Sequence, residues 1–168
     1  EDLVQVLPSP VNKALTQELM NQADLVVVTG SQNNVKRAYS SGTPAIGVGA
    51  GNVPVIIDTT ADLADAANKI MMSKCFDNST SCSSENSITI LDAVYDDAIQ
   101  ALKDAGGYLC TPEDKKKIEE TLWVDGHLNR HVIAKDPDVF AETCGLPEEA
   151  KSAKFFMVED ENAAGKDH

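Results

Sequence analysis

One cysteine in a polar loop is the residue of this chain whose setting points most directly to chemistry. Cys82 lies in the stretch KCFDNSTSCSSENSITI, residues 74–90, among serines and a threonine and ahead of a strand-like run. A thiolate becomes a nucleophile when its pKa falls or when backbone N–H groups hold its charge, and a loop between a helix and a strand offers such groups. A free cysteine is more commonly a small, buried, inert residue. Both interpretations of Cys82 stay open at this point.

Three other cysteines and a histidine pair offer weaker chemistry. The cysteines form no CxxC pair, and packing explains each of them: Cys75, Cys110 and Cys144. His127 and His131 are the closest pair of histidines, four residues apart as in a helical metal site. Gly126 and Asn129 disfavour the helix that such a site needs. We therefore predict no metal site and place both histidines on the surface.

The composition excludes several classes of partner. The 168 residues are 42% hydrophobic and 24% charged, as in ordinary globular proteins. A formal net charge of −13 leaves no basic stripe to neutralise phosphates, which argues against nucleic acid as the main partner. No apolar run approaches the roughly 20 residues that cross a bilayer, so no membrane association is expected. With no paired cysteines and no signal-like segment, we expect a cytoplasmic protein and leave its completeness open.

The elements on either side of Cys82 must hold it in place. Residues 60–72 predict an amphipathic helix with Thr60 or Asp62 near its cap. Its apolar side is formed by Leu63, Ala66, Ala67, Ile70 and Met71. Beyond Cys82, the alternation from Ser87 to Leu91 predicts a strand. A loop anchored on two rigid elements can keep a reactive atom in position.

A second candidate site follows the first apolar run. Residues 11–22 predict a helix, and the β-branched run 23–30 is typical of a strand in a parallel sheet covered on both faces. The helix predicted next, residues 31–39, would be capped by Ser31 or Asn33. The turn between strand and helix thus lies beyond the carboxyl end of a strand, where open α/β sheets bind ligands. Its serine and asparagine side chains would also serve as ordinary helix caps.

Glycine is concentrated between residues 43 and 54. The stretch TPAIGVGAGNVP alternates small residues with glycine and precedes the apolar run 55–58. Such a density predicts either positive φ angles or backbone pressed against a ligand or a neighbouring strand. The change in composition also suggests a crossing between domains.

The rest of the chain continues the alternation of helices and strands. The pattern predicts helices at 95–104, 112–122 and 137–144 and strands at 131–134 and 154–158. Residues 159–168 are polar and patternless, and we expect a loop there. The predicted fold class is α/β.

Three segments carry a family resemblance. They are VTGS at 28–31, GVGAGNVP at 47–54, and FDN at 76–78 followed by Cys82 and SEN at 84–86. In this order and spacing they resemble the aldehyde dehydrogenase superfamily, and more narrowly its CoA-acylating branch. The loop TSCSSEN and the turn SQNN look most like those of acylating sulfoacetaldehyde dehydrogenases. The resemblance covers nearly the whole chain, to about Val158.

The resemblance implies a parallel-sheet, Rossmann-like aldehyde dehydrogenase fold, of which this chain is a central fragment. Residues 1–47 would be the C-terminal part of the cofactor-binding domain, and residues 48–168 the N-terminal part of the catalytic domain. Family members are much longer. The fragment alone is expected to show little or no turnover, because oxyanion stabilisation and cofactor binding come partly from segments outside it. A homo-oligomer is expected for the full-length protein.

The resemblance also implies a reaction and a set of site residues. Cys82 matches the nucleophile that attacks the aldehyde carbon to give a thiohemiacetal; a hydride then leaves to NAD or NADP, and a thioester remains on the sulfur. The residues that match the cofactor-binding segments are Thr29, Gly30, Ser31, Gln32, Asn33, Gly47, Val48 and Gly49.

Val48 departs from the hydrolytic members of the family in an informative way. It stands where those members carry a glutamate base, and valine can neither accept a proton nor orient water. The acyl group would therefore wait for the thiol of coenzyme A. Glu85 lies close to Cys82 in sequence, but a carboxylate near the sulfur would oppose the thiolate. We expect Glu85 to be structural, bonded to backbone.

Substrate and cofactor choice stay open at this stage. Sulfoacetaldehyde is the preferred substrate and acetaldehyde the alternative; a sulfonate needs donors or a cation, and loop hydroxyls would supply donors. These hydroxyls belong to Ser79, Thr80, Ser81 and Ser83. The residues that would separate NAD from NADP lie upstream. The competing hypothesis is a non-catalytic α/β module that binds a nucleotide or a partner chain.

Overall fold

The computed structural model describes residues 3–49 and 51–160, which form two compact units. One unit ends at Gly51 and the other begins at Asn52. The predicted domain boundary between residues 47 and 48 falls inside strand β2 (Ala45–Val48). The assignment of the units to cofactor and catalytic domains stays a prediction. Ala50, in the Gly-rich stretch, and residues 161–168, expected to be a loop, lie outside the described residues.

The first unit is a strand–helix–strand motif preceded by a helix. Its elements are α1 (Lys13–Gln22), β1 (Val26–Thr29), α2 (Gln32–Tyr39) and β2. Polar side chains cap both helices: the Asn12 side chain accepts from the amides of Ala14 and Leu15, and Ser31 Oγ accepts from the amide of Asn34. The Ser31 cap was one of two predicted candidates, and the Asn12 cap was not predicted. β1 and β2 pair in parallel, with Thr29 opposite Val48. This matches the predicted strand, turn and helix.

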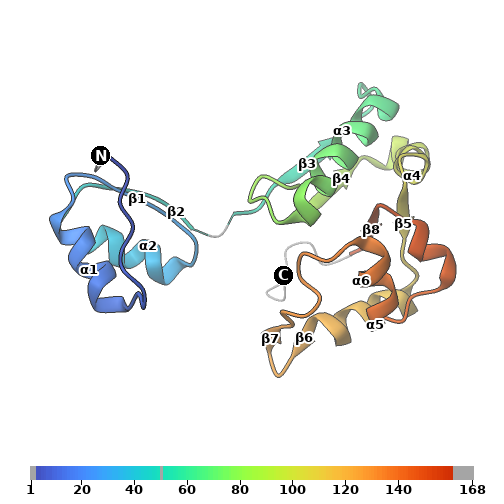
Figure 1. Cartoon of the computed structure of the whole chain (residues 1–168). Coiled ribbons are helices and arrows are strands. Elements are labelled where there is room, and N and C mark those ends of the chain that lie inside the picture. The colour runs from blue at the N-terminus through green and yellow to red at the C-terminus, as the bar shows by residue number, and fades with distance from the viewer. Residues whose placement is uncertain (1–2, 50, 161–168) are drawn as a thin grey trace. The chain divides into compact units, whose positions relative to one another are not determined.

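One face of the β1–β2 pair is covered and the other is bare. Both helices lie on the same side of the strands (Figure 1), where Met20, Val26 and Ala38 form a small core. On the opposite side, Val27 is 70% exposed, and Ile46 and Val48 are more than half exposed. The prediction of a sheet covered on both faces is therefore wrong for the described residues, since no described helix packs on that side.

The second unit begins with a parallel strand pair that carries the Cys82 loop. β3 (Pro54–Ile57) and β4 (Ser87–Ile90) pair in parallel, with α3 (Leu63–Cys75) and the short η1 (Phe76–Ser79) between them. The short helix η2 (Asp92–Val94) and α4 (Tyr95–Asp104) follow. Asp62 caps α3 through the amide of Asp65. The core of this part contains Ile57, Ala67, Ile70, Ala98, Leu102 and Phe155.

The remaining elements of the second unit include a second parallel strand pair. They are β5 (Gly107–Leu109), α5 (Pro112–Leu122), β6 (Trp123–Val124), β7 (His127–Leu128), α6 (Pro137–Thr143), η3 (Glu148–Ser152) and β8 (Phe155–Met157). β5 pairs in parallel with β8. The core here contains Cys110, Ile118, Ala141, Cys144, Leu146 and Ala150.

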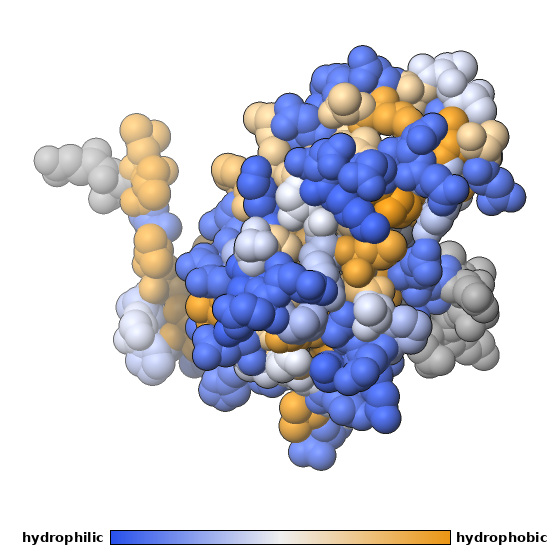
Figure 2. All heavy atoms as spheres, turned by 90° about the vertical axis from the view of Figure 1, so that its right-hand side faces the viewer, coloured by the Kyte–Doolittle hydropathy of each residue, from blue (hydrophilic) through white to orange (hydrophobic). Residues whose placement is uncertain are grey.

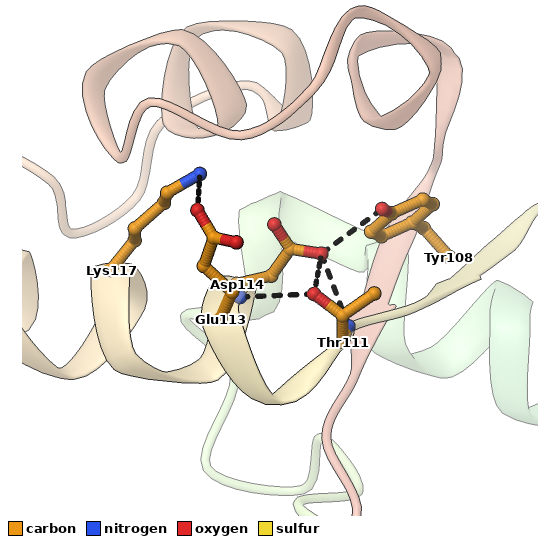
Figure 3. Close-up of polar contacts among 5 residues, drawn as sticks. All are labelled: Tyr108, Thr111, Glu113, Asp114 and Lys117. Atoms are coloured by element: carbon orange, nitrogen blue, oxygen red, sulfur yellow. Dashed lines mark hydrogen bonds and ion pairs between the residues drawn. The ribbon is translucent and has the colours of Figure 1, made fainter.

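A capping network fixes the start of α5. The Asp114 side chain, 3% exposed, accepts hydrogen bonds from the Thr111 amide at 3.1 Å, the Thr111 hydroxyl at 2.8 Å and the Tyr108 hydroxyl at 3.1 Å (Figure 3). Thr111 Oγ1 in turn accepts from the Asp114 amide. Burial raises the pKa of Asp114, but these bonds and the charge of Lys117 outweigh it, so the pKa of Asp114 is lowered.

Two sequence predictions of local structure are wrong. Residues 131–134, predicted as a strand, form turns, because the His131 amide donates to Asn129 Oδ1 and Ala134 has a φ of 56°. The short β6–β7 hairpin was not predicted; Asp125 and Gly126 form its turn with positive φ angles.

One face of the second unit is mainly polar. Hydrophilic side chains cover most of the face seen in Figure 2, with apolar patches between them. Among residues 3–49 and 51–160, no helix has the length and apolar character that a bilayer crossing requires.

Candidate active site

Cys82 is exposed, unlike the other cysteines of the chain. Cys110 and Cys144 are buried, and Cys75 is half-buried with its thiol donating to the carbonyl of Lys154. Burial raises the pKa of the Cys75 and Cys144 thiols, and raises that of Cys110 to about 11. Packing therefore accounts for these three, as predicted. It does not account for Cys82, whose role as nucleophile stays a prediction.

A tight turn presents Cys82 at its tip. The Ser84 amide donates to the carbonyl of Ser81 at 3.0 Å, which makes Cys82 and Ser83 the two central residues of a four-residue turn. The hydroxyls of Ser81 and Ser83, the residues before and after Cys82 in sequence, lie 2.9 Å apart and share a hydrogen bond. This bond closes the turn on the side of the two serines.

The segment that leads into this turn has an unusual backbone. Asp77, Asn78 and Ser79 have φ angles of 49°, 50° and 63°, a left-handed run without glycine. Side chains hold it: Thr80 Oγ1 donates to the Asp77 carboxylate at 2.6 Å, and Ser79 Oγ to the carbonyl of Lys74. Such strained backbone persists when the surroundings impose it, and it concentrates at functional sites.

A distant segment holds the same stretch in place. The Asn78 side-chain amide donates to Asp136 Oδ1 at 3.0 Å and to the carbonyl of Ala134 at 3.4 Å. Asp136 is the residue just before α6. Residues 134–136, where no site was predicted, therefore support the Cys82 loop.

Two buried polar groups lie directly after the turn. Ser84 is 8% exposed, and neither its hydroxyl nor one carboxylate oxygen of Glu85 has a hydrogen-bond partner. The backbone bond expected for Glu85 is absent for that oxygen. Lys74 is close enough to interact electrostatically: burial lowers the pKa of Lys74, and the charge of Glu85 opposes this. Glu85 thus has a buried carboxylate oxygen and a lysine within electrostatic range.

A shallow hollow of about 390 Å³ adjoins the turn. Ser81 and Ser83 form one side of it, and one face of α3 and the start of η1 form the other. The residues from that second side are Lys69, Met72, Ser73 and Phe76. The sequence prediction missed the α3 residues, although their spacing places them on one helix face, away from the core side.

The predicted cofactor residues lie together in the first unit. Thr29 ends β1, and Gly30, with a φ of 123°, donates its amide to the carbonyl of Val48 at 3.2 Å. Ser31 caps α2, whose first residues are Gln32 and Asn33, both exposed. The structure therefore brings the turn after β1 next to the end of β2.

Gly47 and Gly49 allow α2 to approach β2 closely. A Cβ atom at Gly47 would lie 2.8 Å from Val35 and 2.9 Å from the Tyr39 ring, and one at Gly49 would lie 2.7 Å from the Gln32 side-chain oxygen. Neither glycine has a positive φ, and the groups packed against them are side chains of α2 rather than the ligand or neighbouring strand that the sequence suggested. Tyr39, which the sequence prediction missed, accepts the Gly47 amide with its hydroxyl at 3.0 Å.

The histidines do not form a metal site. His127 lies in β7 and His131 in a turn, and both are exposed. Within the part of the chain that the structure describes, no group of three or more His, Cys, Asp or Glu side chains is placed to hold a metal ion.

The family model described as the aldehyde dehydrogenase family matches residues 1–116. The chain belongs to the aldehyde dehydrogenase family. Acylating sulfoacetaldehyde dehydrogenases are among its relatives: one from Cupriavidus necator is 48% identical over 99% of this chain, and one from Bilophila wadsworthia is 47% identical over 87%. The chain spans 34% and 32% of the length of these two dehydrogenases, in agreement with the prediction that it corresponds to a part of the family fold.

Solved aldehyde dehydrogenase structures share the fold. An acetylating aldehyde dehydrogenase from Geobacillus thermoglucosidasius matches 89% of this chain with a TM-score of 0.80 and 38% identity, over 33% of its own length. An engineered glycolyl-CoA reductase with bound NADP+ matches 90% of the chain over 35% of its own length (TM-score 0.79, 28% identity). A Rhodopseudomonas palustris propionaldehyde dehydrogenase with bound propionyl-CoA matches 89% over 34% (TM-score 0.77, 27% identity). The α/β, parallel-strand fold prediction is confirmed.

Proposed function

We propose that the protein containing this chain is a CoA-acylating aldehyde dehydrogenase. It converts a short aldehyde, coenzyme A and NAD(P)+ to acyl-CoA and NAD(P)H. The single observation that carries the proposal is the exposed thiol of Cys82, which a constrained loop holds in a tight turn. The named acylating relatives support it.

Cys82 supplies the covalent chemistry. Its thiolate attacks the aldehyde carbon, a C–S bond forms, and the carbonyl oxygen becomes the oxygen of a thiohemiacetal. Loss of the hydride from that carbon restores the C=O bond and leaves a thioester on the sulfur. The thiol of coenzyme A then attacks the thioester carbon, and Cys82 leaves as the free thiolate.

NAD(P)+, when bound, accepts the hydride. The residues proposed to hold it are those at the end of β1, at the start of α2 and in β2: Thr29, Gly30, Ser31, Gln32, Asn33, Gly47, Val48 and Gly49. The fit is physical, since the first turn of a helix has free N–H groups that favour phosphate. The Gln32 side chain lies against the Gly49 backbone, where a Cβ atom would exclude it.

Val48 favours thiolysis over hydrolysis of the thioester. Its side chain is 55% exposed and carries no group that can take a proton from water. Glu85, the nearest carboxylate in sequence, has a buried oxygen and interacts with Lys74. Neither residue is suited to activate water.

Sulfoacetaldehyde is the proposed substrate, and acetaldehyde is the alternative. The relatives named as sulfoacetaldehyde dehydrogenases favour the first, and the acetylating enzyme among the solved structures favours the second. A cytoplasmic homo-oligomer remains our expectation for the full-length protein.

The test is turnover of both aldehydes by the full-length protein, with NAD+ or NADP+ and with or without coenzyme A. We expect acyl-CoA formation that requires coenzyme A, and a higher kcat/KM for sulfoacetaldehyde. Formation of the free acid at the same rate without coenzyme A would overturn the acylating proposal. A strong preference for acetaldehyde would overturn the sulfonate assignment alone.

A further inference from the structure

The hollow next to the Cys82 turn holds donor-bearing residues within an otherwise mainly apolar lining. Ser73, Ser81, Ser83 and Lys69 are among the residues that line it, and no aspartate or glutamate is. The chain as a whole has a net charge of −13, and Lys69 is the one cation among the residues that line this hollow.

We propose that Lys69 determines specificity for aldehydes that carry a compact anionic group such as a sulfonate. The inference rests on the proposed function, because it assigns the substrate class of the same site. While the carbonyl carbon lies at the Cys82 sulfur, the anionic end lies in the hollow, where Lys69 and the serine hydroxyls donate to its oxygens. Met72 and Phe76 contact the apolar part of the substrate.

Lys69 is free to take this role at little cost. Its ammonium lies 2.6 Å from Asp65 Oδ2, one helical turn earlier, and the two side chains are 73% and 54% exposed. Exposed ion pairs of this spacing contribute little to stability, so a substrate oxygen can replace Asp65 as the partner. The hydrogen bond and charge of Asp65 raise the pKa of Lys69, which keeps the ammonium protonated at neutral pH.

The residues that line the hollow favour a short substrate. Ser81 and Ser83 flank Cys82 in sequence and also line the hollow, so two of its donor-bearing residues are the immediate chain neighbours of the cysteine. A two-carbon aldehyde with an anionic end would meet those hydroxyls first and the longer, flexible side chain of Lys69 at its far side.

The decisive experiment compares Lys69→Met and Lys69→Arg in the full-length protein. Lys69→Met keeps most of the apolar stem and removes the charge. We expect kcat/KM for sulfoacetaldehyde to fall about tenfold to a hundredfold and that for acetaldehyde to stay within about twofold, since a charged hydrogen bond is lost only with the anion. Lys69→Arg should recover most of the loss. An equal effect of Lys69→Met on both aldehydes would overturn the proposal.

Two further variants test the assignment: one should leave kcat/KM unchanged, and the other should raise it for sulfoacetaldehyde. Lys116→Met removes a lysine of similar exposure, 75%, from a helical pair with Glu120 that lies outside the hollow. This variant should leave kcat/KM for both aldehydes unchanged. Asp65→Asn removes the competing carboxylate and should raise kcat/KM for sulfoacetaldehyde about twofold to threefold. A fall on Asp65→Asn equal to that on Lys69→Met would contradict the role of Lys69, because it would show that the ion pair itself is what matters.

A binding measurement separates this inference from the proposed function. Ethanesulfonate should slow alkylation of Cys82 by iodoacetamide in the wild-type protein and not in Lys69→Met, and the neutral ethyl methyl sulfone should protect neither. This pattern would support the anion site even if no aldehyde were turned over. Protection of both proteins, or of neither, would overturn the inference while leaving acyl-CoA formation as a separate result.

Discussion

Asn86 and Val53 are joined by two hydrogen bonds. The Val53 amide donates to Asn86 Oδ1 at 3.0 Å, and the Asn86 amide donates to the Val53 carbonyl at 3.2 Å. Val53 directly precedes β3 and Asn86 directly precedes β4. The contact therefore closes the parallel pair at the end where the Cys82 loop returns to it.

Replacing Asn86 with alanine should loosen this end of the loop. The Val53 amide would lose its partner, and we expect a loss of about 1 kcal/mol in the free energy of unfolding. Thermal unfolding and the rate of Cys82 alkylation would measure the effect on the fold and on the loop. Asn21→Ala, at an exposed helix position, is the matched control. An alkylation rate unchanged by Asn86→Ala would show that the contact does not position Cys82.

The four cysteines should differ in reactivity. Alkylation needs an accessible thiolate, so Cys82 should be modified first, Cys75 more slowly, and the two buried cysteines last. Because burial raises the pKa of Cys110 to about 11, its thiol stays protonated at pH 8. Mass spectrometry after timed iodoacetamide treatment between pH 7 and 9 would give the order. Equal labelling of all four would favour the non-catalytic module instead.

A glutamate at residue 48 should divert the reaction toward hydrolysis. Val48→Glu places a carboxylate where the family resemblance locates the base of hydrolytic members, and the exposed position tolerates its charge. General bases commonly contribute a factor of about a hundred or more, so free acid should rise at least tenfold relative to acyl-CoA. The ratio of free acid to acyl-CoA among the products measures this change. Val48→Gln, which has the shape without the base, should keep the wild-type ratio.

Alanine at the two close-packed glycines should have different effects. Gly47→Ala would push against Val35 and the Tyr39 ring and should cost about 1–3 kcal/mol of stability. Gly49→Ala meets only the flexible end of Gln32, so the fold should survive while the carboxamide moves. We expect unchanged unfolding and a higher KM for NAD(P)+ in Gly49→Ala. Equal loss of stability in both variants would contradict the distinction.

Asp114 should lower the free energy of unfolding as pH falls. Its pKa is lowered in the folded protein, so its contribution is present above the unfolded value near 4 and is lost as pH falls through the folded pKa. Asp114→Asn should cost about 2 kcal/mol at pH 7 and progressively less below pH 4. Glu113→Gln, which removes a surface pair with Lys117, should cost at most about 0.5 kcal/mol. Urea unfolding at pH 3–7 would compare the two.

Local patterns predicted the elements that lie close together in sequence. The helices Tyr95–Asp104 and Pro112–Leu122 match their predicted bounds, and Ser31 caps α2 as one of the two predicted candidates. These features depend on neighbouring residues: a polar cap, a proline at the first turn, an apolar stripe. The sequence contains all of that information within a few positions.

Features that depend on distant partners were missed. No strand was predicted at Gly107–Leu109, yet this segment forms β5 because β8 pairs with it from far along the chain. The contact between Asn78 and Asp136 likewise has no local signal. The Asp125-Gly126 hairpin was different, since this dipeptide is a known turn signal and could have been found.

The sequence pointed to the candidate site residues but not to the helix face beside them. Cys82 and the β1 turn follow from residue type and family resemblance. The α3 side of the hollow, with Lys69, Met72 and Ser73, went unnoticed because an exposed helix face resembles ordinary surface until the loop is seen to lie against it.

The left-handed run Asp77–Ser79 lowers the stability of the protein but holds the loop that leads to Cys82. Each of these residues costs about 1–2 kcal/mol of backbone energy that glycine would not incur, yet their side chains hold the path of the chain toward the thiol. Laboratory evolution for heat resistance alone would therefore introduce glycine at these positions. Evolution for turnover would retain the original residues, so the two selections should yield different loops from the same parent.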